Sequence, residues 1–248
     1  MNRSNEPIIS KSQLIAQCCA IKAYTGWHVN QAANICRERS GGQGFLSANR
    51  FGLAITGTHS SITAEGDCSV LMMKTVMELM NDVQKDQDKK KEMMKLGSLS
   101  IMKGPQNFPT AWIFKGISFL KNFRRERYVD LFKMRYGASA MNCMNASMNL
   151  TPAEAKFIKG IGGKLEDENS KMRKRKVQYH QTASKNQPLI QKMANDWVEW
   201  FVLDSFKEAI EQEDDENVRE VLWNLHDMYA LDCIKNDLGY FQDYFLRL

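Results

Sequence analysis

Apolar residues recur three or four positions apart along most of this chain, which is the spacing of one face of an α-helix. Within residues 10–39 the spacing is interrupted near Gly26, so we expect two helices there or one helix with a kink. The same spacing returns from Cys68 onward. Two long final segments, whose apolar faces begin at Leu189 and Val218, predict a C-terminal helix pair. The pattern therefore predicts a mostly α-helical, bundle-like body of one or two lobes.

Glycine and proline interrupt this pattern at a few places. Three glycines within residues 40–44 predict the end of a helix, because glycine adopts the left-handed conformation of a helix C-cap without strain. Small, β-branched and glycine residues make 45–63 the segment where we expect a short β-hairpin or an extended stretch. Pro105 and Pro109 mark a seam between segments. We expect three segments, which could also form one continuous domain: an N-terminal helical lobe (1–104), a basic helical region with a flexible loop (105–187) and an acidic C-terminal helical hairpin (188–248).

Charge is distributed unevenly along the 248 residues. The net charge is +5, but residues 196–248 hold fourteen Asp and Glu and only four Lys and Arg, which leaves +15 on the first 195 residues. A basic body points to an anionic partner. The acidic end could dock on a basic surface of its own chain or of a second copy.

Basic and aromatic residues alternate within residues 115–136, which also continue a helical pattern. Single-stranded RNA needs this mixture, because cations neutralise its phosphates and aromatic rings stack on its bases. The alternative is an amphipathic helix with its rings in the core. The residues predicted here to contact RNA are Lys115, Lys121, Arg124, Arg125, Arg127, Tyr128, Lys133, Arg135 and Tyr136.

Two other basic stretches could extend such a surface. Arg37 and Arg39 precede the glycines of residues 40–44, whose N–H groups could hold a phosphate, although a helix cap is the favoured interpretation. The second stretch could be a mobile wall of an RNA groove, a solvated loop or a nuclear import signal. Its basic residues are Lys171, Arg173, Lys174, Arg175 and Lys176.

Aromatic residues are concentrated in the final helix pair, in greater number than one hairpin can shield from water. They could dock onto the body of the same chain, or they could join copies of the chain. The residues predicted for self-association are Trp197, Trp200, Phe201, Trp223, Phe241, Tyr244 and Phe245.

Sequence motifs for catalysis are missing: the chain has no GxSxG elbow, no HExxH and no Walker A loop. Its six cysteines and four histidines are scattered without metal-ligand spacing. We therefore expect no enzyme, no cofactor and no metal site, with a nuclease built from dispersed carboxylates as a weaker alternative. The chain lacks a secretory signal and any apolar run of about 18 residues, so we expect an intracellular protein without a transmembrane segment.

The combination of a mostly helical chain, a basic body with interleaved aromatic residues, a basic loop and an acidic apolar end resembles the small helical nucleoproteins of RNA viruses. The resemblance implies a protein that coats single-stranded RNA without sequence preference and assembles with itself. It would occur in the virion and the host cytoplasm, or in the nucleus through residues 171–176, with a viral polymerase as a further partner. The alternative function is a helical matrix or adaptor protein that binds an anionic membrane or an acidic protein.

Overall fold

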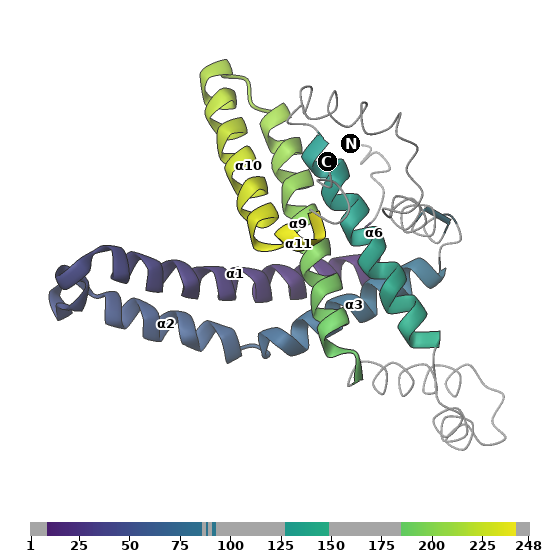
Figure 1. The fold of residues 1–248 in the computed structure, drawn as a ribbon, viewed down its shortest axis with the longest axis horizontal. Helices are drawn as coiled ribbons and strands as arrows, with labels where there is room; N and C mark the ends of the chain where they lie inside the picture. The colour runs from purple at the N-terminus through teal and green to yellow at the C-terminus, as the bar shows by residue number, and fades with distance from the viewer. Residues whose placement is uncertain (1–8, 86–87, 89–90, 93–126, 149–184, 242–248) are drawn as a thin grey trace, which may run out of the picture. The chain divides into compact units, whose positions relative to one another are not determined.

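A computed structural model describes residues 9–85, 88, 91–92, 127–148 and 185–241 (Figure 1). All regular elements among these residues are helices, and no strand occurs within them. The prediction of a mostly α-helical chain is confirmed. The features predicted for residues 105–126 and 149–184 lie outside the described residues.

The chain divides into two compact units. Unit 1 comprises Met1–Gln87 and Ser147–Asn195, and unit 2 comprises Asp88–Ala146 and Asp196–Leu248. The boundaries near residues 104 and 187 that the sequence suggests stay a prediction.

Unit 1 is built around α1 (Lys11–Arg39), which packs along α2 (Phe51–Thr63) and α3 (Cys68–Lys85) (Figure 1). The buried face of α1 consists largely of small side chains, which let neighbouring helices approach closely. The buried apolar residues of α1 and α3 are Ala16, Ala20, Ala23, Tyr24, Cys68, Met72, Val76, Leu79 and Val83.

The helix α1 is continuous, although its apolar pattern is interrupted near Gly26. Gly26 is buried, and a Cβ atom there would lie 3.4 Å from the Cys68 sulfur and 3.6 Å from the Ser61 carbonyl oxygen. The interruption thus marks a close approach of neighbouring helices. The alternative of two separate helices is wrong.

Residues 45–63 are helical, so the expectation of a β-hairpin or extended stretch is wrong. Two short 3₁₀ helices, η1 (Gly41–Phe45) and η2 (Ser47–Asn49), lead into α2. Within α2, hydroxyl groups donate to preceding backbone carbonyls, as those of Thr56 and Ser61 do at 2.9 and 2.6 Å. The contact of α2 with α1 outweighs the weak helix propensity of its Ser, Thr and Gly residues.

The end of α1 agrees with the prediction from its glycines. The helix ends at Arg39, and Gly41 adopts a left-handed φ of +56°. Gly44 lies against the end of the helix, where a Cβ atom would be 2.2 Å from the Arg37 carbonyl oxygen. A glycine is needed at residue 41 because of the positive φ angle, and at residue 44 because there is no space for a Cβ atom. The helix-cap interpretation is therefore confirmed.

Unit 2 contains the main part of α6 (Arg127–Met148), α9 (Gln187–Glu211) from residue 196, α10 (Glu216–Asn236) and α11 (Leu238–Phe241). The predicted helix pair is present as α9 and α10 (Figure 1). The carboxylate of Asp215 accepts two N–H bonds from the first turn of α10, at 2.8 and 3.2 Å, and thereby caps this helix.

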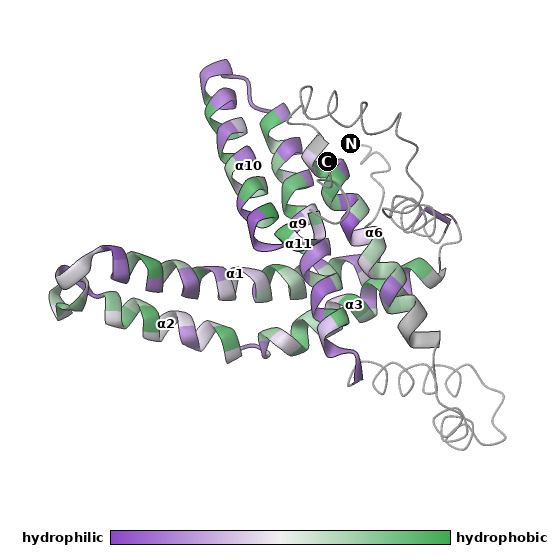
Figure 2. Cartoon of the chain, viewed as in Figure 1, coloured by the Kyte–Doolittle hydropathy of each residue, from purple (hydrophilic) through white to green (hydrophobic). Residues whose placement is uncertain are grey.

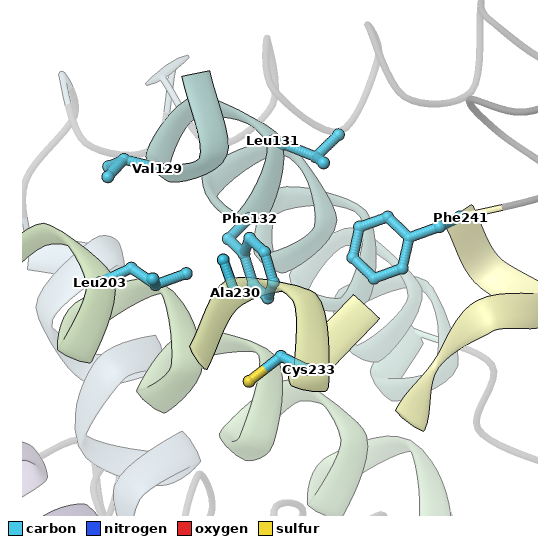
Figure 3. Close-up of a cluster of buried hydrophobic side chains, with 7 residues drawn as sticks. All are labelled: Val129, Leu131, Phe132, Leu203, Ala230, Cys233 and Phe241. Atoms are coloured by element: carbon cyan, nitrogen blue, oxygen red, sulfur yellow. The ribbon is translucent and has the colours of Figure 1, made fainter. Parts of the chain in front are cut away.

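The core of unit 2 joins α6, α9, α10 and α11 (Figure 3). The second helix of the predicted pair ends at Asn236, and the chain then forms α11. This arrangement places the Phe241 ring 5.5 Å from that of Phe132. The buried cluster consists of Val129, Leu131, Phe132, Leu203, Ala230, Cys233 and Phe241.

The helix α10 buries a different face from the one that its apolar pattern predicts. His226, Ala230 and Cys233 are its buried residues. Five aliphatic residues of the apolar face that begins at Val218 are exposed, whereas Ile234 packs against the core, and hydrophobic and polar positions alternate along the helix (Figure 2). These exposed residues are Val218, Val221, Leu225, Met228 and Leu231.

We predict that Gly44→Ala destabilises the protein, because the new methyl group would overlap the Arg37 carbonyl oxygen. The expected loss is about 1–3 kcal/mol, which corresponds to a fall in Tm of several degrees. Gly42→Ala is the matched control, since nothing lies within 4 Å of a Cβ atom there. Thermal unfolding followed by circular dichroism measures both, and equal Tm values for the two variants would contradict the close approach.

Candidate functional site

The turn between α2 and α3 holds a carboxylate in an uncommon backbone conformation. Glu65 has a φ of +58°, and the neighbouring Gly66 has a φ of +106°. Positive φ is rare for residues other than glycine, and such strained positions cluster at functional sites. Among the described residues, the other non-glycine residue with positive φ is Arg50, which precedes the first residue of α2.

A lysine on α1 holds this turn in place. The Lys22 ammonium group donates to the carbonyl oxygens of Gly66 at 2.6 Å and of Ile62 at 3.4 Å. These two carbonyls lie on either side of Glu65 in the sequence. One side chain of α1 therefore fixes the backbone before and after Glu65.

The two carboxylates of the turn have different surroundings. Asp67 accepts N–H bonds from Ser69 at 2.9 Å and from Val70 at 3.2 Å, and it thereby caps α3. Glu65 is exposed, and within the described part of the chain no hydrogen bond or ion pair involves its carboxylate. Glu65 is thus available to a ligand, whereas Asp67 has a structural role.

Gly66 is required at its position for two reasons. Its φ of +106° disfavours any other residue, and a Cβ atom would lie 3.2 Å from a methyl group of Leu71. The sequence TAEGD contains a turn signal in its Gly and Asp. Nothing in that signal distinguishes Glu65 from other acidic residues, so sequence reasoning missed it.

A second polar site, in unit 2, surrounds Arg135, whose side chain is 1% exposed. The Nε atom of Arg135 lies 3.2 Å from Asp196, Nη1 lies 3.4 Å from Asp237, and Nη2 pairs with Glu199. The Ser139 hydroxyl donates to Asp196. These bonds connect α6, α9 and the residue between α10 and α11.

Electrostatics support a structural role for this site. Burial by itself lowers the pKa of Arg135, but the three carboxylates raise it overall, so the guanidinium stays charged. Burial raises the pKa of Glu199, and Arg135 offsets part of that effect. The rings of Phe132 and Phe241 have centroids 4.6 and 5.2 Å from the guanidinium carbon. A cation enclosed in this way has no access to a ligand.

The described residues among those predicted to contact RNA are mostly engaged inside unit 2. Tyr136 is buried and stacks on Trp200 at 5.9 Å. Lys133 pairs with Glu92 at 2.9 Å. Tyr128 is half-buried, 6.4 Å from the His226 ring. With Arg135 enclosed as well, these residues do not form an exposed binding surface.

The remaining residues predicted to contact RNA fall into two groups. Arg37 is half-buried and Arg39 is exposed, both in the last turn of α1. Arg127 is the first residue of α6, and its side chain is outside the described part. The others lie outside the described residues: Lys115, Lys121, Arg124, Arg125, Lys171, Arg173, Lys174, Arg175 and Lys176.

Aromatic residues predicted for self-association pack against their own unit where they are described. Trp197 is buried and stacks on Phe201 at 5.3 Å. Trp223 lies 5.3 Å from the His226 ring, Trp200 stacks on Tyr136, and Phe241 belongs to the core. Self-association through these residues stays a prediction. Tyr244 and Phe245 lie outside the described residues.

Two further kinds of site were sought among the residues that the structure describes. No group of three or more His, Cys, Asp or Glu side chains there could hold a metal ion. No helix in the same ranges is long and apolar enough to cross a membrane.

Two protein-family models match separate parts of the chain. The model of the acyl-CoA oxidase C-alpha1 domain matches residues 2–80, and the acyl-CoA oxidase model matches residues 155–246. The chain is similar to acyl-CoA oxidases. The first match contains α1, α2, the Glu65 turn and α3 as far as residue 80, and the second contains α9, α10 and α11. No curated protein sequence matches the chain.

Solved acyl-CoA oxidases have the same fold. Acyl-CoA oxidase 1 of Yarrowia lipolytica is 19% identical, with a TM-score of 0.61, over 93% of this chain and 30% of that one. The tomato enzyme is 16% identical, with a TM-score of 0.60, over 96% and 32%. Acyl-CoA oxidase 1 of Arabidopsis thaliana is 19% identical, with a TM-score of 0.55, over 93% and 30%. The chain thus spans about a third of the length of these oxidases.

The resemblance to viral nucleoproteins is therefore wrong. The family matches to acyl-CoA oxidase models contradict RNA coating, the alternative of a membrane matrix or adaptor protein, and the single-stranded RNA and viral polymerase partners. They also contradict the expectation that the chain has no part in an enzyme. The alternation of basic and aromatic residues led to a wrong prediction, because Arg135 does not face RNA but pairs with carboxylates inside its own unit. An intracellular location stays a prediction.

We predict that Arg135→Met destabilises unit 2 by about 3–5 kcal/mol, because it leaves three carboxylates without their buried cation. The loss should be smaller at pH 5 than at pH 7.5. The folded-state pKa of Glu199 is already raised, and without Arg135 it rises further, so acid pH protonates Glu199 and relieves the repulsion.

Lys133→Met is the control for this variant, since its pair with Glu92 is exposed to solvent and is worth about 0–1 kcal/mol. Urea unfolding of both variants at the two pH values gives the comparison. A loss for Arg135→Met that is equal at both pH values would contradict the carboxylate explanation.

Proposed function

We propose that this chain forms part of an acyl-CoA-oxidising enzyme and that Glu65 is the base that removes a proton from the acyl group. Matches to two acyl-CoA oxidase family models and the shared fold support the first part. The observation that carries the second part is the exposed Glu65 carboxylate, without a partner among the described residues, on a backbone held at positive φ.

The chemistry of an acyl thioester explains why a carboxylate is needed. Oxidation of the acyl chain removes two hydrogens, and the one next to the thioester carbonyl is the more acidic. A base takes that hydrogen as a proton, and the second hydrogen leaves with an electron pair to the oxidant. Glutamate is a suitable base when it is positioned by its surroundings.

The structure positions Glu65 through its backbone. Lys22 holds the carbonyls of Ile62 and Gly66, and Gly66 lies so close to Leu71 that a Cβ atom there would be 3.2 Å from a Leu71 methyl group. A base that is fixed in this way meets its substrate without reorganisation, which lowers the entropic cost of the reaction. The same turn also contains Asp67, but its carboxylate already accepts hydrogen bonds from backbone N–H groups of α3.

We predict that Glu65→Gln lowers the rate of acyl-CoA oxidation by about 10²–10⁴-fold, because the amide cannot accept the proton. Oxygen consumption after addition of a saturated acyl-CoA measures the oxidation. Exchange of the hydrogens next to the thioester carbonyl for solvent deuterium, followed by mass spectrometry, measures the proton removal separately and needs no oxidant.

Asp67→Asn is the matched control, two residues away in the same turn. It should leave both rates near those of the unchanged protein and cost about 1 kcal/mol of stability or less through the weakened helix cap. Equal exchange rates for Glu65→Gln and the unchanged protein would contradict the role of Glu65. If the unchanged enzyme that contains this chain neither binds nor exchanges nor oxidises an acyl-CoA, the proposed function itself is wrong.

A further inference from the structure

A histidine that the proposed reaction does not use is enclosed within unit 2. His226 lies on α10, and its side chain is 0% exposed. The other buried residues of this helix are Ala230 and Cys233, which lie on the same face in the two turns that follow. The packing of α10 within its unit therefore depends in part on the ring of His226.

Three aromatic rings surround His226. The ring centroids of Phe206 on α9, Trp223 on α10 and Tyr128 on α6 lie 5.7, 5.3 and 6.4 Å from that of the imidazole. The planes of Phe206 and Trp223 are inclined to the imidazole by 61° and 79°, which is the edge-to-face arrangement that aromatic rings favour. Ring packing at His226 thus joins α10 to α6 and α9.

Both ring nitrogens of His226 are buried without a hydrogen-bond partner among the described residues. Buried polar side-chain atoms usually have such a partner, so this histidine is an exception. A neutral imidazole has one N–H donor and one acceptor, whereas the protonated ring has two donors and a positive charge. An enclosure that satisfies neither nitrogen is therefore tolerable for the neutral ring and much less so for the cation.

The charged and titratable groups around His226 compensate a positive charge only in part. On α10, the nearest Asp227 oxygen lies 3.8 Å from Nδ1, longer than a hydrogen bond, because consecutive helix residues do not face each other. On α9, Lys207 disfavours a second cation, and on α6 the titratable group is the phenol of Tyr128. Burial lowers the pKa of His226, and the Leu203 backbone and Asp227 offset only part of this effect.

We propose that His226 is a pH-sensitive contact, which holds α10 against α6 and α9 while its ring is neutral and releases α10 when the ring is protonated. The neutral ring packs among its aromatic neighbours, but a cation is more stable in water than in this enclosure. Attraction between a cation and the faces of the rings offsets only part of that difference. Acid pH therefore favours states in which His226 has left the enclosure.

The direction and size of the pH effect follow from proton linkage. A histidine in an unfolded chain has a pKa of about 6.5, and the pKa of His226 in the folded protein is lower. Between these two values the unfolded state binds more protons, so the stability of unit 2 falls as the pH drops below about 6.5. Within that window the unfolding equilibrium constant rises by up to about tenfold for each pH unit. The raised pKa of Glu199 acts in the opposite direction, so the contribution of His226 is measured as a difference between variants.

Urea unfolding of the full chain at pH 7.5 and pH 5.5 tests the contact. Acidification should raise the unfolding constant of the unchanged protein several-fold more than that of His226→Phe, whose ring cannot be protonated. His226→Leu gives the same comparison if the larger ring does not fit. His59→Phe is the matched control, since His59 is an exposed histidine of α2, and it should respond to acid as the unchanged protein does. Equal responses of the unchanged protein and the His226 variants would overturn the proposal.

Hydrogen exchange of backbone amides, followed by mass spectrometry, locates the opening. After correction for the direct effect of pH on exchange, the amides of α10 should lose protection at pH 5.5 in the unchanged protein and retain it in His226→Phe. The amides of α1, which belongs to unit 1, should retain protection in both proteins. A loss of protection that is equal in α10 of the two proteins, or as large in α1 as in α10, would show a general effect of acid and overturn the proposal.

Discussion

The close packing of α1 against α2 and α3 is the constraint on which unit 1 depends. Alanines and Gly26 on one face of α1 leave room for the neighbouring helices, and larger side chains there would push them away. Because α2 and α3 are held near α1, Lys22 can reach the carbonyls of the turn between them. The conformation of Glu65 is thus a consequence of how closely three helices pack.

Unit 2 depends on a buried ionic interaction in addition to its apolar core. Arg135 brings together carboxylates from α9 and from the residue that separates α10 and α11, and two phenylalanine rings enclose it. Removing such a cation leaves buried negative charge without compensation. The free-energy cost of this uncompensated charge exceeds the net stabilisation that the intact ion pair provides. The position of α11, and with it that of Phe241, is therefore coupled to the charge of one arginine.

The residues that the structure singles out differ from those that are conspicuous in the sequence. The high density of basic residues suggested a polyanionic binding partner. Arg135, Tyr136 and Lys133 instead make contacts within unit 2. Conversely, Glu65 is one of many acidic residues, and its distinction is a backbone angle and the lack of a partner among the described residues. Motif searches could not find it, because a single carboxylate on a turn has no characteristic spacing.

The sequence by itself determined the helical class, the end of α1 at its glycines and the hairpin of α9 and α10, because these depend on local periodicity and capping. Only the tertiary structure decided that residues 51–63 are helical, since packing on α1 overrides their weak propensity. It also decided which face of α10 is buried: His226, Ala230 and Cys233 are covered, and several larger aliphatic residues of the helix stay exposed. Periodicity identifies apolar faces, but the size and charge of the neighbouring helices select which face is covered.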